Sequence, residues 1–296
     1  MSHLYTEVRG TGPALVLLHG WGLNVRVWDG LAAALCDRFR IVAVDLPGHG
    51  RSAWLPERSS LEEQAAQVGE AVAAITTEYS LLGWSLGGQI ALQLAARQAR
   101  RHEAGARPRD PAAAVDRLVL IATTPRLAAG PDWPHGAPPE RLAVQAAQLR
   151  SDYRRTVSDF LELQVRGSTG GADVLGQLRA ALFAHGAPAA LAPGGEAPRG
   201  DSGERSDVPG PHLAALARGL ELLRDTDLRP LLADITVPTL VIAGQYDRVT
   251  MPAASHALAD SLPNARYVEI RRAAHAPFLS HLPELGALIS GFLLQT

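Results

Sequence analysis

The segment 81–88, Leu-Leu-Gly-Trp-Ser-Leu-Gly-Gly, constrains the fold of this chain more than any other segment. It begins as an apolar run typical of a buried strand, and the helix-forming residues 89–96 follow directly. Between the two, Ser85 is flanked by Gly83 and Gly87 in the pattern Gly-x-Ser-x-Gly. In that pattern a serine sits on a sharp turn between strand and helix, and the glycines permit close backbone approach. The segment therefore predicts a strand-turn-helix unit with Ser85 as a candidate nucleophile.

Short apolar runs that end in turn residues recur along the chain, as expected for strands buried on both faces of a parallel sheet. They lie at residues 15–18, 41–44, 81–82, 118–121 and 240–243, with a more polar last strand at 267–270. Between them, apolar residues at helical spacing predict helices over 28–35 and 61–75. Ser59 and Glu62 have the spacing of a capping box, so we expect them to begin the second helix. This alternation of strand and helix predicts an α/β fold with a doubly wound, mostly parallel sheet.

The alternation stops between residues 125 and 234, where helical spacing continues without convincing strands. Three helical segments are expected there, over 142–161, 175–183 and 213–223. We interpret 125–234 as a helical cap inserted into a core made of 1–124 and 235–296. Within the cap, the Gly/Pro-rich segment 186–211 lacks the apolar residues that offset ordering entropy, so it predicts a flexible loop. The polar segment 100–116 predicts a second loop.

Composition limits the possible partners and the compartment. With 296 residues, 47% of them hydrophobic, the chain can bury one substantial core. A net charge of −2 gives no general attraction to nucleic acid or to anionic membranes. The N-terminus lacks the pattern of a signal peptide, and no apolar run is long enough to cross a bilayer. Cys36 is the single cysteine, which excludes an intrachain disulfide and a cysteine-based metal site. We expect a soluble, cytoplasmic monomer without a metal.

A serine hydroxyl is a poor nucleophile at neutral pH, so Ser85 requires a histidine base and an acid that orients that base. In a strand-turn-helix architecture of this kind the chain order is serine, acid, histidine. Asp247 comes just after the apolar run 240–243, and His275 follows the last predicted strand. Asp247 and His275 are therefore the predicted acid and base.

Other acids and another histidine compete for these roles. His281 lies close to His275 in the sequence and remains an alternative base. The acids Asp225, Asp227 and Asp234 precede the strand at 240–243, and their positions favour helix capping or solvation. Asp260 lies within or at the end of a predicted helix. Asp247 is therefore preferred as the acid.

An ester carbonyl that is attacked by a serine becomes an oxyanion, which needs two backbone N–H donors at about 3 Å. One donor comes from the residue after the nucleophile, Leu86, and the other from the loop after an early strand. That loop is 19–22, His-Gly-Trp-Gly, where Trp21 is the expected donor. Its indole is also expected to form one wall of the substrate pocket.

Four motifs resemble those of the α/β-hydrolase superfamily. They are the segments 19–24, 45–52, 83–88 and 273–278. The combination of His-Gly-Trp-Gly-Leu-Asn with Gly-Trp-Ser-Leu-Gly-Gly is most similar to the family of esterases that act on pimeloyl-acyl-carrier-protein methyl ester in biotin synthesis. The resemblance implies an α/β-hydrolase fold, a triad of Ser85, Asp247 and His275, and an oxyanion hole at Trp21 and Leu86. It implies no cofactor.

The same resemblance implies how the substrate is held. A segment of the cap would lie over the acyl chain; its residues are Phe160, Leu161, Glu162, Leu163 and Gln164. Members of the family bind their acidic acyl carrier protein through arginines on the cap. Here only Arg155 has a clear counterpart, because Asp159 occupies the position before Phe160. The candidates for carrier docking are Arg150, Arg154, Arg155 and Arg166.

Three functions are compatible with these residues. The resemblance favours an esterase that hydrolyses the methyl ester of an acyl chain through an acyl-enzyme. A general short-chain carboxylesterase or a carbon–carbon bond hydrolase would use the same triad. A non-catalytic ligand-binding protein on the same fold is the third, although the chain retains all three triad residue types and both oxyanion loops.

Overall fold

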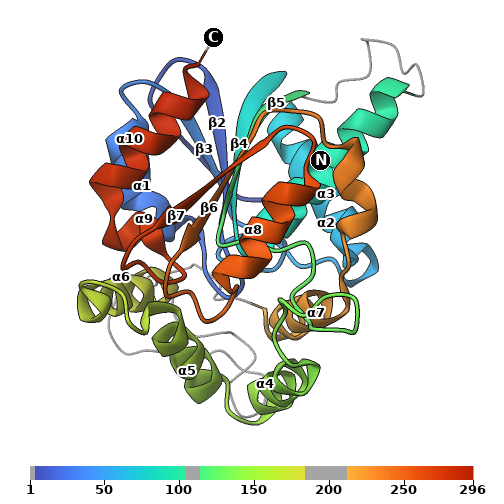
Figure 1. The fold of residues 1–296 in the computed structure, drawn as a ribbon, viewed down its shortest axis with the longest axis vertical. Coiled ribbons are helices and arrows are strands. Elements are labelled where there is room, and N and C mark those ends of the chain that lie inside the picture. The colour runs from blue at the N-terminus through green and yellow to red at the C-terminus, as the bar shows by residue number, and fades with distance from the viewer. Residues whose placement is uncertain (1–3, 104–113, 184–211, 296) are drawn as a thin grey trace, which may run out of the picture.

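The computed structural model describes residues 4–103, 114–183 and 212–295. They form a seven-stranded sheet with helices on both faces and further helices at one end (Figure 1). The strands are β1 Thr6–Arg9, β2 Ala14–Leu18, β3 Arg40–Val44, β4 Glu78–Trp84, β5 Ala114–Ile121, β6 Thr239–Gly244 and β7 Ala265–Ile270. Their order across the sheet is β1-β3-β2-β4-β5-β6-β7, and only β1 pairs in the antiparallel direction. The predicted doubly wound, mostly parallel α/β fold is confirmed.

Strand β1 was not predicted from the sequence. It lies at the edge of the sheet, where it pairs with β3, and all of its residues are at least partly exposed. An edge strand that faces solvent does not need a continuous apolar run. Its sequence, Thr-Glu-Val-Arg, therefore lacks the pattern by which the central strands are recognised.

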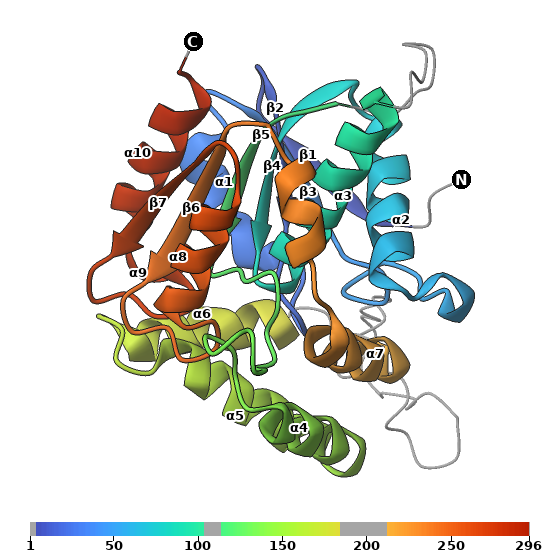
Figure 2. The same cartoon turned by 45° about the vertical axis from the view of Figure 1, so that its right-hand side comes forward.

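Helices cover both faces of the sheet. One face carries α1 Asp29–Leu35, α9 Pro277–Ser280 and α10 Leu282–Leu293, and the other carries α2 Leu61–Ala73, α3 Leu86–Glu103 and α8 Pro252–Ser261 (Figures 1 and 2). Short 3₁₀ helices are η1 Val25–Trp28, η2 Pro56–Arg58 and η4 Arg229–Asp234. The arrangement leaves the carboxyl ends of the parallel strands facing the remaining helices.

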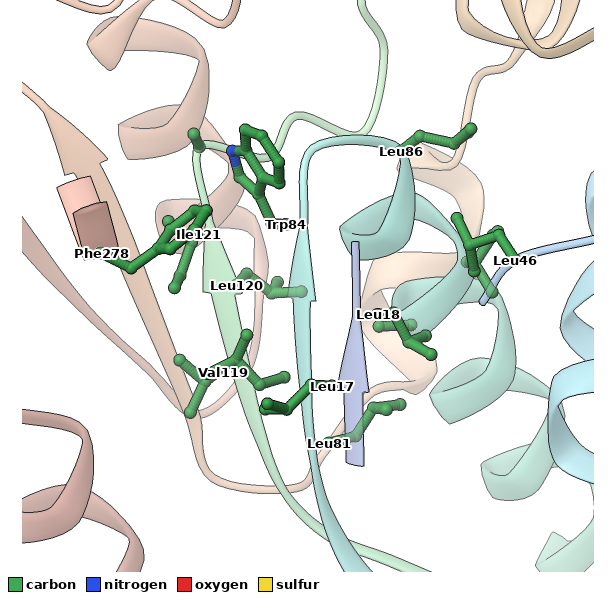
Figure 3. Packing of buried hydrophobic residues seen from close by; sticks show 14 of the residues in the cluster. Leu17, Leu18, Leu46, Leu81, Trp84, Leu86, Val119, Leu120, Ile121 and Phe278 are labelled. Atoms are coloured by element: carbon green, nitrogen blue, oxygen red, sulfur yellow. The ribbon is translucent and has the colours of Figure 1, made fainter. Parts of the chain in front are cut away.

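The core is centred on β2, β4 and β5, whose middle residues are fully buried. Leu17 of β2 is in register with Leu82 of β4, which is in register with Val119 of β5. Such side chains each stabilise the fold by about 1.5–3 kcal/mol through burial. Trp84 and Phe278 pack edge to face above them, with ring centroids 4.9 Å apart (Figure 3). The end of β4 is therefore held rigidly.

Helix α2 begins at Leu61, as the predicted range 61–75 requires, but its capping box lies one residue later than predicted. The residues of its capping box are Ser60 and Glu63, so the predicted pair of Ser59 and Glu62 is wrong. Ser59 ends η2 in a helical conformation, with φ −105° and ψ −4°. Ser60 has the extended backbone that an N-cap requires, with φ −65° and ψ 158°.

Four described α-helices between β5 and β6 lie beyond the carboxyl ends of the strands (Figure 2). They are α4 Pro139–Ser151, α5 Tyr153–Val165, α6 Gly171–Phe183 and α7 Leu213–Asp225. The single helix expected over 142–161 is thus two helices, because the chain leaves helical geometry at Asp152. The Asp152 carboxylate accepts a hydrogen bond from the Arg155 N–H (3.0 Å) and caps α5.

We propose that 125–234 is a cap on a core of 1–124 and 235–296, because α4 to α7 leave the sheet order uninterrupted. The expected flexible loop at 186–211 lies outside the described residues, as does most of the insert at 100–116. Among the helices that the structure describes, none combines the length and apolar character needed to cross a membrane.

Candidate active site

Ser85 lies on the turn between β4 and α3, in a left-handed backbone conformation with φ 55°. This conformation is uncommon for a residue with a side chain, and it is typical of functional sites. The Ser85 N–H donates to the carbonyl of Ile121 at the end of β5 (3.0 Å). Its carbonyl accepts from Gly88 and Gln89 in the first turn of α3. The backbone on both sides of the serine is therefore fixed.

The two glycines of the motif are required by close packing. A Cβ atom at Gly83 would lie 2.5 Å from the carbonyl oxygen of Gly87, and one at Gly87 would lie 2.3 Å from that of Leu18. Leu18 is the last residue of β2, so the start of α3 packs directly against the loop that contains Trp21. The glycines thus bring the nucleophile loop and the predicted oxyanion loop together.

Asp247 and His275 form a buried pair. The Nδ1 atom of His275 lies 2.7 Å from Oδ2 of Asp247, and their exposed fractions are 1% and 4%. The other carboxylate oxygen, Oδ1, accepts from the N–H groups of Val249 (2.8 Å) and Thr250 (2.9 Å). Because Asp247 engages Nδ1, Nε2 is the ring nitrogen left to act on a serine hydroxyl.

The backbone of His275 is held on both sides. Its N–H donates to the carbonyl of Gln164 in α5 (3.0 Å), and its carbonyl accepts from the Nε1–H of Trp84 (2.8 Å). Trp84 directly precedes Ser85, so one side chain links the predicted base to the predicted nucleophile. No local sequence pattern predicts either hydrogen bond, since both join residues far apart in the chain.

The alternative acids and base lie elsewhere. The ring of His281 is 2.8 Å from the hydroxyl of Ser280, in the break between α9 and α10. Three competing aspartates form surface ion pairs: Asp225 with Arg224, Asp227 with Arg229 and Asp234 with Arg100. The fourth, Asp260, lies 3.0 Å from the ring of His256. Asp247 is the one of these acids that contacts His275.

The side chains of Trp21 and Leu86, the predicted oxyanion donors, both lie next to Gly219 of α7. A Cβ atom at Gly219 of α7 would approach the Trp21 ring at 2.6 Å and the Leu86 side chain at 3.8 Å. Leu86 is the first residue of α3, so its N–H has no acceptor within the helix. The Trp21 indole donates to the carbonyl of Leu216 in α7 (2.8 Å), which fixes the ring beneath the cap.

The predicted substrate segment, 160–164, lies in α5. Phe160 meets the Trp21 ring edge to face, with centroids 5.2 Å apart, while Leu161 and Gln164 are buried. Glu162 is exposed and pairs with Arg179 of α6 (3.1 Å), so its carboxylate faces away from Trp21. Phe160 and Leu163 also line a groove of about 340 Å³ between α4 and α5. The groove is largely apolar, and Phe160 is common to it and to the contact with Trp21.

The candidate docking arginines run from the end of α4, which contains Arg150, to the residue after the end of α5. Arg154 and Arg155 are exposed in its first turn, and Arg166 is exposed just after its end. Arg155 forms an ion pair with Asp159 one turn later, with Nε and Oδ2 3.8 Å apart. The side chain of Arg150 is outside the described part of the chain.

A buried histidine and a buried aspartate that were not predicted as site residues shape the oxyanion loop. The neutral ring of His19 accepts from the N–H of Leu46 (3.0 Å), because burial lowers the pKa of His19 to about 4. Asp45 accepts from the N–H groups of Val25 (2.7 Å) and Arg51 (2.9 Å). His19 immediately precedes Gly20, and Asp45 follows a strand. Those positions are the sequence signal that could have identified them.

We find no cluster of three or more histidine, cysteine, aspartate or glutamate side chains suited to a metal in the part of the chain that is described.

Replacement of Trp84 by phenylalanine is expected to lower kcat for a small activated ester by about 10-fold, because the buried carbonyl of His275 loses its donor at a cost of about 1–3 kcal/mol. Trp28 provides a matched control, since its buried indole Nε1 has no hydrogen-bond partner among the described residues. Trp28→Phe should leave kcat unchanged. Steady-state kinetics and thermal unfolding of both variants test this, and equal loss of kcat would contradict the role of the Trp84 hydrogen bond.

The chain belongs to the α/β-hydrolase family, because the family model described as alpha/beta hydrolase fold matches residues 13–282. Relatives named pimeloyl-[acyl-carrier protein] methyl ester esterase match nearly its full length. That of Nitrosomonas europaea is 36% identical over 281 residues, which cover 95% of each chain. That of Stenotrophomonas maltophilia is 37% identical over 290 residues, 98% of this chain and 96% of the relative. The resemblance inferred from the motifs is confirmed.

Solved structures of this fold are also similar. An esterase from Exiguobacterium antarcticum matches with a TM-score of 0.77 at 19% identity, covering 99% of this chain and 96% of that one. An enol-lactonase from Burkholderia xenovorans matches with a TM-score of 0.74 at 24% identity and the same coverage. At these identities the likeness shows the fold alone.

Proposed function

We propose that this protein is a serine esterase that hydrolyses the methyl ester of an acyl chain attached to acyl carrier protein. Ser85 is the nucleophile, His275 the base and Asp247 the acid that orients the base. The observation that carries the proposal is the buried 2.7 Å contact between Asp247 and His275. The carbonyl of His275 also accepts a hydrogen bond from Trp84, the residue before Ser85. The full-length similarity to esterases with this named substrate supports the choice of ester.

In the first half of the reaction, the Ser85 hydroxyl attacks the ester carbonyl while Nε2 of His275 takes its proton. The carbonyl oxygen becomes an oxyanion, which the N–H groups of Trp21 and Leu86 stabilise. The imidazolium of His275 then returns its proton to the methoxy group as the C–O bond breaks. Methanol leaves, and the acyl group remains on Ser85.

In the second half, a water molecule replaces methanol. His275 takes a proton from water, and the resulting hydroxide attacks the acyl-enzyme carbonyl. Collapse of the second oxyanion breaks the bond to Ser85, which recovers its proton from His275. The products are a free carboxylate at the former ester end and the regenerated enzyme.

Asp247 acts by holding His275 in one tautomer. Its Oδ2 accepts a hydrogen bond from Nδ1–H, which leaves the lone pair of Nε2 directed away from the acid. The two N–H groups that bind Oδ1 stabilise the carboxylate as an anion. The anion in turn stabilises the imidazolium formed in each half-reaction.

The acyl chain is assigned to the apolar surface around Phe160. This ring contacts Trp21 on one side and lines the groove between α4 and α5 on the other. Apolar pockets with a few polar groups bind acyl chains through burial of methylene groups, each worth about 0.8 kcal/mol. The chain would extend from Ser85 past Phe160 toward the surface.

A substrate panel tests this function. We expect the methyl ester of a carrier-linked dicarboxylate to be hydrolysed with kcat/KM at least about 10-fold higher than a free short methyl ester, since carrier and acyl chain add binding contacts. The free medium-chain methyl ester is the matched control that separates acyl recognition from carrier recognition. Equal rates on all three substrates would instead identify a general short-chain carboxylesterase.

A further inference from the structure

The chain around Trp21, the proposed oxyanion donor, is bonded to two helices of the cap. The Trp21 indole donates from Nε1 to the carbonyl of Leu216 in α7 (2.8 Å). The Asn24 side chain donates from Nδ2 to the carbonyl of Ala181 in α6 (2.7 Å). Both bonds are buried, and they join residues 195 and 157 positions apart. The loop that supplies an oxyanion donor is therefore held by the cap as well as by the core.

Gly219 lies in the middle of α7 and packs against Trp21. A Cβ atom at Gly219 would lie 2.6 Å from Cδ1 and 2.9 Å from Nε1 of the indole. Both distances are well below the separation of about 3.5–4.0 Å at which non-bonded atoms attract one another. A glycine inside a helix is less stable than alanine, so close packing is the physical reason for this glycine. Gly219 thus allows α7 to approach the indole closely enough for the bond to Leu216.

The first turn of α7 packs against the loop after β3. The His212 N–H, just before the helix, donates to the carbonyl of Gly48 (2.9 Å). A Cβ atom at Gly48 would lie 2.2 Å from the Cβ atom of Ala215, and the φ of 71° at this position also favours glycine. In the same loop, the Leu46 N–H donates to the ring of His19 (3.0 Å), two residues before Trp21. Helix α7 is thus fixed to the core beside the oxyanion loop.

The Trp21 side chain has little freedom to move. It is 2% exposed, and Phe160 of α5 meets its ring edge to face, with centroids 5.2 Å apart. Its backbone belongs to a tight turn, in which the Leu23 N–H donates to the carbonyl of Gly20 (3.3 Å). Because the turn is short, a displacement of the enclosed indole also displaces the peptide group that carries the Trp21 N–H.

We propose that α7 positions the oxyanion donor through the indole of Trp21, with Gly219 as the positioning residue. The carbonyl of Leu216 holds the indole in one orientation, and the missing side chain at Gly219 leaves room for it. An oxyanion donor acts on charge that develops in the transition state, so its displacement lowers kcat more than it weakens substrate binding. This inference rests on the proposed function, because it concerns the oxyanion hole of the same esterase site.

Addition of one methyl group to Gly219 tests the proposal. In Gly219→Ala we expect kcat for a small activated ester to fall by about 10- to 100-fold while KM changes by less than about 3-fold, because small displacements of a catalytic group are costly. Gly176→Ala is the matched control in α6, where a Cβ atom would meet none of the described residues within 4 Å. It should leave kcat unchanged and raise the thermal midpoint, since alanine favours the helix.

Inhibitor affinity gives a readout that a purely structural role would not move. An alkyl boronic acid adds to the hydroxyl of Ser85 and forms a tetrahedral anion that requires the oxyanion hole, whereas the alcohol with the same alkyl chain has no carbonyl or anion. In Gly219→Ala the inhibition constant of the boronic acid should rise by about the factor by which kcat falls. That of the alcohol should change by less than about 2-fold, because the apolar pocket is retained.

A double-mutant cycle assigns the effect to the contact with Trp21. Trp21→Phe keeps the backbone N–H but removes Nε1, and we expect kcat to fall by about 10-fold because the ring loses its bond to Leu216. The smaller ring leaves room for a methyl group. Gly219→Ala should therefore lower kcat by less than about 3-fold when it is added to Trp21→Phe.

Several outcomes would overturn the proposal. They are a wild-type kcat in Gly219→Ala, an equal loss in Gly176→Ala, losses that add in the cycle, or equal weakening of the boronic acid and the alcohol. If thermal unfolding shows that Gly219→Ala does not fold, Trp21→Phe decides alone, and an unchanged kcat in that variant rejects the role of α7. The small activated ester makes these results independent of the carrier, so failure of the substrate panel would reject the proposed ester and leave this inference standing.

Discussion

Replacement of Ser85 by alanine is expected to reduce ester turnover by about 10⁴-fold or more, because no other group forms the covalent intermediate. The fold should survive, since the left-handed backbone of this turn is held by the bond to Ile121 and by the packing of Gly83 and Gly87. Burst kinetics with an activated ester and mass spectrometry of the trapped acyl-enzyme measure the effect. Thermal unfolding of the variant provides the control for folding.

The acyl adduct locates the nucleophile independently of the rate. In the wild-type enzyme the added mass should map to the peptide that contains Ser85, and it should be absent from Ser85→Ala. An adduct on another serine, or wild-type turnover by the alanine variant, would show that Ser85 is not the nucleophile.

Loss of the base should be almost as damaging. We expect His275→Ala to lower kcat by about 10⁴-fold, because Ser85 then has no group to accept its proton. His281→Ala is the matched control in the same stretch of chain, and it should change kcat by less than about 3-fold, as its ring contacts Ser280 rather than an acid. Steady-state kinetics of both variants across a pH range is the measurement.

The relative size of the two losses decides which histidine is the base. If His281→Ala were the inactive variant and His275→Ala the active one, the contact between Asp247 and His275 would have to be structural. In that case Asp247→Asn should also leave activity intact, which gives a second, independent check on the assignment.

The central sheet could be predicted from the sequence because its signals are local. Strands such as β2 and β3 are buried on both faces and therefore appear as continuous apolar runs ended by turn residues. The signal for the Gly-x-Ser-x-Gly turn is equally local, since Gly83, Ser85 and Gly87 lie within five positions. Strand β1 has no such signal, because an exposed edge tolerates polar residues.

Boundaries within the helical region were harder to predict. The apolar spacing runs from α4 into α5 without a change of phase, so it gives no sign of the break at Asp152. At that break Asp152 ends α4 and is also the N-cap of α5. The spacing of apolar residues does not predict this double role of a polar residue. The same applies to Ser59 and Ser60, where two adjacent serines both satisfied the spacing rule.

In the candidate site too, some residues could be predicted from local patterns and others could not. Ser85, Asp247 and His275 could be selected because each follows a recognisable strand in a known order. The bond from Trp84 to His275 joins residues 191 positions apart, and no local pattern encodes it. Contacts of this kind arise only when the sheet edge is assembled.

The bond from the His275 N–H to the carbonyl of Gln164 has a consequence for how such enzymes can diverge. Gln164 belongs to the segment assigned to the acyl chain, so one stretch of α5 both shapes the pocket and supports the base. A chimera that received the cap of another hydrolase would have to reproduce this carbonyl, or it would change reactivity together with selectivity. The cap is therefore not an exchangeable module, and new substrate ranges are more accessible through side-chain changes at positions such as Phe160 and Leu163.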